Sequence, residues 1–458
     1  MSSISGKAID LYTLLVYNTT KIGELMRKIV KYKGITILYE SHHKNKASDV
    51  EFGIFTGSDL DGKKMGLAHM FEHSLFFSTK NRTTEDLSSF RSMHAASSSA
   101  YTSQFVTAMT FYESSKALDK ILSVLSDHFF NSLPTEEELA KEKKIVIEEL
   151  IRAKQNDGRK IHNTYLNMIL DKKRQFLSSL GTEDTIKSFS IKDLKAYRKK
   201  WYKRQNFFFS ICTNVSLFKI KRLVNKYFIP FLDDEPSFKP IFLVSTSNTK
   251  SAIKTISKQG KPLCTIKVMK MLDVNYSLEN SVRCSVVENS LNIPQNRMFQ
   301  TFREKHGLTY EYPSISTILS NKYGYLSFDV RVGAKNIKKA LDLASELFAD
   351  LNNNGITEDE FKTYQLLRER QKDVSLISPV KGEAGSNLRT YYARQKFVGN
   401  RPFRKYRNSL KYKDVNEYSK QLFNPNKIYV LIFGEFDKKD IYSLSKIKKL
   451  FNIPSETK

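Results

Sequence analysis

The chain contains little cysteine for its length. Its 458 residues include three cysteines, Cys212, Cys264 and Cys284, which lie far apart. An odd number of scattered cysteines gives neither a disulfide framework nor a cysteine-rich metal site. We therefore expect a reducing location, either the cytoplasm or another intracellular compartment.

Segments that would carry the chain to or through a membrane are also lacking. The first ten residues have no basic stretch followed by an apolar run and a small-residue cleavage site. The apolar residues 11–17 are too few to span a bilayer, and no other stretch reaches that length. We expect no signal peptide, no transmembrane segment and no membrane partner.

Negative charge is scarce, with 48 Asp and Glu against 75 Lys and Arg, so the formal net charge is +27. Such a surface attracts anionic partners through a salt-sensitive field. The basic residues are spread as singles and short runs, for example at 172–174 and 198–200. No zinc knuckle, RNP-type strand or basic tail accompanies them. We interpret them mainly as a solvated surface and keep nucleic-acid binding as an alternative.

The chain is long enough for two domains, and an internal repeat indicates where they lie. Residues 193–197, Asp-Leu-Lys-Ala-Tyr, are echoed at 414–418 with an offset of 221 residues. Residues 135–139, Thr-Glu-Glu-Glu-Leu, are echoed at 357–361 with an offset of 222. Two similar halves of about 220 residues follow.

The expected boundaries are a first domain at 1–232, a polar linker at 233–258 and a second domain at 259–458. In each half, runs of helical pattern accompany strands that look antiparallel. This pattern favours the α+β class, with a mainly antiparallel sheet packed by helices in each domain. The clearest strands are predicted at 34–40, 50–55, 207–212, 265–271 and 326–332, and the clearest helices at 84–94, 114–130, 135–155, 191–203, 217–228 and 295–305.

The stretch Gly-Leu-Ala-His-Met-Phe-Glu-His, residues 66–73, carries the strongest chemical signal. On a helix, positions three and four apart share a face, so His69, Glu72 and His73 project together. Two imidazoles are good Zn²⁺ ligands, and the spacing His-x-x-Glu-His is the inverted zincin motif. The alternative is an amphipathic core helix that carries these residues by chance.

The helical segment 136–150 is the expected source of a third metal ligand. Its residues Leu139, Val146 and Leu150 form an apolar stripe. Glu142 and Glu149 are seven residues apart on one face of this helix, and Glu149 follows His73 by 76 residues.

Together these motifs resemble the pitrilysin family of zinc peptidases. Three further stretches strengthen the resemblance. Residues 78–80 are similar to the family's Gly-Thr-Lys turn, residues 100–103 to its Asn-Ala-x-Thr strand, and residues 303–310 to its Arg-Glu-x-x-Gly-Leu-x-Tyr element. The resemblance implies half of a clamshell built from two homologous domains.

The resemblance also implies roles for the first-half motif residues. His69, His73 and Glu149 would hold one Zn²⁺ per chain, with water in the fourth tetrahedral position. Glu72 would act as the general base on the zinc-bound water and pass the proton to the departing amine. Glu142 would hydrogen-bond a ligating histidine. Its alternative role is one more solvated charge on a Lys/Glu helix.

Substrate contacts follow from the same resemblance. Ser99 and Ala100 would lie on the edge strand that pairs with the substrate backbone. The family usually has Asn at the position of Ser99. The shorter serine side chain reaches less far, so we expect weaker orientation of the substrate and lower activity. Arg303 and Tyr310 would hold the substrate backbone and stabilise the oxyanion. Without the motif, they would be read as a surface arginine and a tyrosine at the start of a strand.

The second half lacks the zinc motif, and Gln371 stands at the position equivalent to Glu149. The Arg/Tyr element of one half would therefore serve the zinc of another, in a homodimer or with a related partner chain. We predict a zinc endopeptidase that hydrolyses acidic or neutral peptides or unfolded segments. The alternatives are a catalytically silent scaffold subunit of the same fold and a basic nucleic-acid-binding protein.

Overall fold

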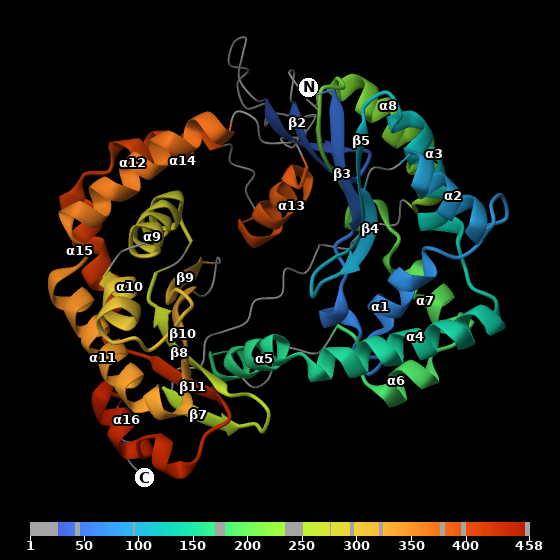
Figure 1. The fold of residues 1–458 in the computed structure, drawn as a ribbon. Helices are drawn as coiled ribbons and strands as arrows, with labels where there is room; N and C mark the ends of the chain where they lie inside the picture. Colours follow the sequence, from blue (N-terminus) through green and yellow to red (C-terminus); the bar gives the residue numbers. More distant parts are fainter. Residues whose placement is uncertain are drawn as a thin grey trace, which may run out of the picture.

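The computed structural model describes residues 26–41, 46–94, 97–169, 179–233, 251–274, 276–293, 297–319, 324–375, 381–394 and 400–453. The strands form two sheets, one in each half of the chain, and helices pack against both (Figure 1). This arrangement confirms the predicted α+β class with two related sheet-and-helix halves.

The first sheet has the strand order β1-β2-β6-β3-β5-β4. Its strands are β1 (Arg27–Tyr32), β2 (Ile35–Ser41), β3 (Ala47–Ile54), β4 (Ser97–Thr102), β5 (Thr107–Ser114) and β6 (Phe207–Thr213). Neighbours are antiparallel except β2 and β6. Strands β2 and β3 follow each other in sequence, but β6 lies between them and pairs with both. The last strand of the first half, β6, therefore lies at the centre of the sheet.

The second sheet has the order β7-β11-β8-β10-β9. Its strands are β7 (Ala252–Ser257), β8 (Leu263–Leu272), β9 (Ser314–Leu319), β10 (Gly324–Gly333) and β11 (Ile428–Gly434). The expected linker at 233–258 is wrong at its end, because β7 is a strand at the edge of this sheet. An edge strand is only half buried and keeps polar residues, so the composition of β7 resembled a linker. Residues 234–250 lie outside the described part.

Eight helices are assigned to the first half within the described residues. They are α1 (Leu67–Ser74), α2 (Thr84–His94), α3 (Leu118–Asn131), α4 (Glu136–Gln155), α5 (Asp157–Ile169), α6 (Glu183–Ser188), α7 (Ile191–Trp201) and α8 (Leu217–Tyr227). Between the sheet and these helices lies a phenylalanine-rich core, in which Phe52 contacts the rings of Phe129, Phe209 and Phe228. These four side chains are fully buried.

The helices of the second half follow one another in a similar order along the chain. They are α9 (Leu278–Leu291), α10 (Arg297–Phe299) continued by a π-helix (Gln300–Lys305), α11 (Ile337–Asn354), α12 (Glu358–Ser375), α13 (Glu383–Arg394), α14 (Asn400–Ser409), α15 (Tyr412–Phe423) and α16 (Leu444–Leu450).

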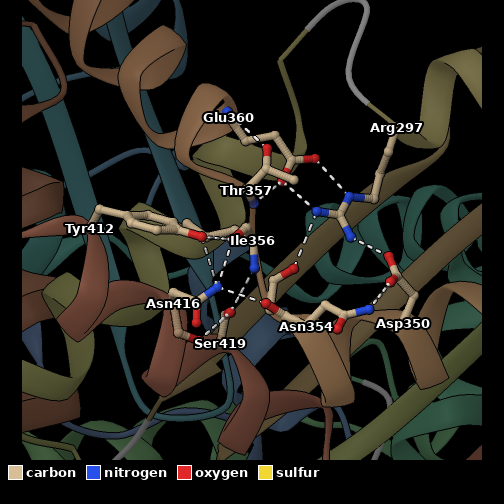
Figure 2. A network of polar contacts seen from close by, with 10 residues as sticks. Arg297, Asp350, Asn354, Ile356, Thr357, Glu360, Tyr412, Asn416 and Ser419 are labelled. Carbon is tan, nitrogen blue, oxygen red and sulfur yellow. Dashed lines mark hydrogen bonds and ion pairs between the residues drawn. The ribbon is translucent and has the colours of Figure 1, made fainter.

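Figure 2 shows the polar contacts where α12 begins, at the position that the repeat makes equivalent to the start of α4. Thr357 and Glu360 cap that helix reciprocally, side chain to backbone, as Thr135 and Glu138 cap α4. The Glu360 carboxylate also binds Arg297, which reaches Asp350 of α11 as well. Arg297 thus ties the start of α10 to both α11 and α12.

Each half lends one helix to the other sheet (Figure 1). Helix α5 packs Tyr165 and Ile169 into a cluster with Met269 and Tyr429 of the second sheet. Helix α13 packs Leu388 onto the first sheet in another small cluster. The N-terminus of α13 is held there because Asp49 of β3 accepts a hydrogen bond from Ala384 N at 2.7 Å. This exchange fixes the two halves to each other.

Candidate metal centre

Helix α1 is set in place by its first turn. Gly66 has φ +89°, and a Cβ there would lie 2.6 Å from the carbonyl oxygen of Leu180, so a side chain does not fit. The Asp61 carboxylate accepts hydrogen bonds from Gly66 N at 2.8 Å and Ala68 N at 3.0 Å. Met70 and Phe71 anchor the helix in the core. The other face then presents the motif side chains towards α4.

The structure brings His69, His73 and Glu149 together. Glu149 Oε2 lies 3.6 Å from His69 Nε2 and 3.7 Å from His73 Nε2. The ligand atoms of the three residues lie within 4.8 Å of one another. Tetrahedral zinc bonds of about 2.0–2.1 Å place ligand atoms roughly 3.3–3.4 Å apart, so a small contraction would suit the ion. The donor set and its spacing therefore fit Zn²⁺.

No other such group is found among the described residues. Gln371, the expected counterpart of Glu149, lies in α12, and its side chain is outside the described part.

Glu142 lies beside the cluster, on the same helix as Glu149. Its Oε1 is 2.6 Å from Nδ1 of His73. A proton on Nδ1 donated to this carboxylate leaves the Nε2 lone pair directed towards His69 and Glu149. The contact is the one expected for a residue that orients a metal-ligating histidine.

The two histidines have opposite pKa shifts without a metal. Burial lowers the pKa of His69 to about 4, and the neighbouring His73 adds to this effect. Burial also acts to lower the pKa of His73, but hydrogen bonds with Glu142 and Glu149 outweigh it and raise that pKa to about 9. The hydrogen bond from His73 lowers the pKa of Glu149. At neutral pH His69 is ready to bind a cation, whereas His73 must first lose a proton.

Glu72 lies at the edge of the cluster. Its Oε2 is 3.9 Å from His69 Nε2, and the residue is buried. Burial raises the pKa of Glu72, although hydrogen bonds from Thr102 oppose the shift. A carboxylate with a raised pKa is a better proton acceptor near neutrality.

Ser99 and Ala100 lie on β4, the edge strand of the first sheet. They pair with Thr110 and Met109 of β5 on one side. No strand among the described residues pairs with the other side of β4. Helix α1 packs against β4, so this open edge runs beside the histidine helix.

Arg303 and Tyr310 are not brought to the histidine cluster of the same chain. Arg303 lies in the π-helix after α10, in the second half, whereas α1 belongs to the first (Figure 1). Its guanidinium stands over the rings of Phe299, Tyr310 and Tyr312 at 5.0–5.8 Å. Tyr310 is 85% exposed. The pair forms an exposed stack suited to contact another molecule.

Two residues near the centre were not assigned a role from sequence. Thr102 hydrogen-bonds Glu72, and it stands inside the strand motif at 100–103. Arg159, in the first turn of α5, carries a positive charge that acts on both His69 and Glu149. Its spacing of ten residues from Glu149 could have suggested that Arg159 lies near the cluster. The break between α4 and α5 means that helical spacing alone does not predict this contact.

No helix in the part of the chain that the structure describes is both long and apolar enough to cross a bilayer.

Two family models match adjacent parts of the chain. Residues 36–182 match the insulinase model of peptidase family M16. Residues 188–367 match the model described as the peptidase M16 inactive domain. The first range contains the whole histidine and glutamate cluster, and the second contains the Arg303 element.

Relatives of the chain are named as proteases or processing peptidases. The chain is 24% identical over 350 residues to the "uncharacterized zinc protease YmxG" of Bacillus subtilis, covering 74% of this chain and 81% of the relative. It is 32% identical over 156 residues to the human mitochondrial-processing peptidase subunit beta, covering 33% of this chain and 31% of the relative.

Solved structures share the fold. A protease from Helicobacter pylori matches with a TM-score of 0.74 at 19% identity, covering 90% of this chain and all of the other. The periplasmic protease PqqL from Escherichia coli matches with a TM-score of 0.76 at 15% identity, covering 95% of this chain but 50% of that longer one. The chain has the size and fold of half such a molecule. It therefore belongs to peptidase family M16, the insulinase or pitrilysin family of zinc proteases.

Proposed function

We propose that the protein is a zinc-dependent endopeptidase that cleaves peptides or unfolded segments. The observation that carries this proposal is the convergence of His69, His73 and Glu149 with the buried Glu72 beside them. These three residues would hold one zinc ion per chain. Zinc, when bound, supplies a Lewis acid that polarises the scissile carbonyl and acidifies the attacking water.

The chain's own residues would provide proton transfer and positioning. Glu72 would take the proton of the attacking water and deliver it to the leaving amine. Thr102 would hold the Glu72 carboxylate through its hydrogen bonds. Glu142 would keep His73 in the tautomer whose Nε2 is free.

Substrate would bind as an added strand. The open edge of β4 at Ser99 and Ala100 offers backbone groups beside α1. Ser99 has a short side chain whose Oγ lies 3.2 Å from the carbonyl oxygen of Ala100, so orientation would depend on backbone pairing. The exposed Arg303 and Tyr310 would contact the substrate of a second copy or a related chain, where they would stabilise the oxyanion.

Peptide charge would affect binding. The net charge of +27 and the nearby Arg159 favour acidic or neutral peptides over Lys/Arg-rich ones. Comparing kcat/KM for matched acidic and basic peptides at low salt checks this preference. Faster turnover of the basic peptide would contradict it.

The test is cleavage of a quenched fluorescent peptide by zinc-loaded wild type, Glu72→Gln and Glu148→Gln. Glu148 is an exposed neighbour on α4 and serves as the control. We expect Glu72→Gln to lose at least about 100-fold in kcat and to retain its zinc. Glu148→Gln should match wild type. A zinc-loaded wild type that cleaves no peptide would favour the silent scaffold instead.

A further inference from the structure

A buried lysine, Lys270, lies in the second half of the chain. Lys270 lies on β8 between Val268 and Leu272, both of which belong to the core on the helix-covered face of the sheet. It is 2% exposed. Among the described residues its amine forms no hydrogen bond or ion pair. Because an unpaired buried amine is costly, this amine requires a hydrogen-bonding partner from outside the described residues, either water or a ligand.

The side chain lines a hollow of about 270 Å³ between the end of β8 and the C-terminal half of α15. Leu272, Val274 and Leu422 supply apolar walls, and Gln421 and Asn424 supply amide groups. The size and lining suit a small organic molecule rather than a single ion.

One carboxylate lines the same hollow, but it is already occupied. Asp273 accepts a hydrogen bond from Lys427 at 2.7 Å on Oδ1 and one from Asn426 at 2.9 Å on Oδ2. Its attraction to Lys270 is partly offset by the repulsion between Lys270 and Lys427. No hydrogen bond joins Asp273 to the Lys270 amine, so the hydrogens of the amine remain open to a group from outside.

A second cation adjoins the hollow. A neighbouring hollow of about 240 Å³ shares Tyr418 and Gln421 with the first and is lined by Arg283. The Arg283 Nε is buried, and no described residue accepts its hydrogen. The guanidinium stands 5.5 Å from the centre of the Tyr418 ring. Lys413, Asp414 and Glu417 also border this second hollow, so its two cations face two carboxylates.

We propose that the hollow beside Lys270 binds a small organic anion. The acid group would pair with the Lys270 amine, and the apolar body would lie against Leu272, Val274 and Leu422. The site belongs to the second half and is separate from the histidine cluster, so it holds whether or not the chain is a peptidase.

The charge state of the lysine supports this site at neutral pH. Burial lowers the pKa of Lys270 to about 8, with Lys427 adding to the shift and Asp273 opposing it. The amine is therefore mostly charged at pH 7 and mostly neutral at pH 9.5. Anion binding should weaken as the pH rises through 8.

Isothermal titration of the full chain with benzoate and with inorganic phosphate tests the site directly, without peptide turnover. Wild type should bind benzoate at pH 7, more tightly than phosphate, since phosphate has no apolar body. Lys270→Met should weaken benzoate binding at least about tenfold, as loss of a charge-assisted contact predicts. The exposed control Lys438→Met should bind as wild type does.

Thermal unfolding separates a lost site from a lost fold. Lys270→Met exchanges an unpaired amine for an apolar chain, so its Tm should equal or exceed that of wild type. Equal benzoate affinity in wild type and Lys270→Met would overturn the proposal, as would no binding by wild type. If phosphate binds more tightly than benzoate, the proposal that the ligand has an apolar organic body is refuted.

Discussion

Zinc uptake should compete with a proton on His73. That proton is held by Glu142 and Glu149, which raise the pKa of His73 to about 9 in the metal-free protein. His69 has a pKa of about 4 and is already neutral at pH 7. Binding zinc at pH 7 must therefore release about one proton from the histidine pair, nearly all of it from His73.

The size of the effect follows from the distance between the pKa and the pH. At pH 7 about 1% of His73 is deprotonated, so zinc binds about 100-fold more weakly than it would well above pH 9. This factor corresponds to roughly 3 kcal/mol. Zinc affinity should rise about tenfold for each pH unit between 7 and 9, and then level off.

The Glu142→Gln variant distinguishes proton competition at His73 from the loss of the contact that orients the His73 ring. Without the carboxylate, the pKa of His73 falls from about 9 towards its ordinary value of 6.5, while Glu149 continues to raise it. The histidine proton released at pH 7 should therefore fall below one, to about a quarter if the pKa reaches 6.5. At pH 9.5, where no proton competes, the variant should bind zinc about 10–100-fold more weakly, because the histidine is no longer oriented.

Titration calorimetry in buffers of different ionisation enthalpy measures the protons released. Glu148→Gln provides the matched control on the same helix and should behave as wild type. Protons released by zinc-bound water contribute to all three proteins and cancel in the difference. Equal proton release by wild type and Glu142→Gln would refute the account of His73.

Three further predictions follow from the structure. Mixing inactive Glu72→Gln and Arg303→Ala chains should restore about a quarter of wild-type activity if one chain completes the site of another, because half of the dimers then hold one intact site; an active monomer in size exclusion with light scattering would contradict this. Phe52→Ala should lower the free energy of unfolding by about 3–5 kcal/mol in urea titrations, since the side chain is fully buried among rings. Asn387→Ala should cost about 1.5–3 kcal/mol by the same measurement, because it removes the 2.6 Å hydrogen bond between α13 and the Glu40 carboxylate; an unchanged value would mean that α13 does not depend on this contact.

Local spacing predicted the centre of the site from sequence. His69, Glu72 and His73 share a helical face because of their three- and four-residue spacing, and the structure keeps them on α1. Glu142 and Glu149 share a face of α4 for the same reason, and both reach the histidines. The partnership between these helices came from the family resemblance, since 76 residues separate them.

Other contacts between distant segments were not predicted from sequence. Insertion of β6 between β2 and β3 depends on pairing across more than 150 residues, which no local pattern records. The exchange of α5 and α13 depends on apolar faces that look the same whichever sheet they cover. Strand β7 was missed because an edge strand needs few apolar residues.

The central claim is that one zinc ion lies among His69, His73 and Glu149. An anomalous difference map collected at the zinc absorption edge from zinc-loaded crystals tests this most directly. We predict one peak per chain, within about 2.0–2.2 Å of Nε2 of both histidines and a carboxylate oxygen of Glu149. A map with no peak at this position, or with the zinc held by other residues, would contradict the account.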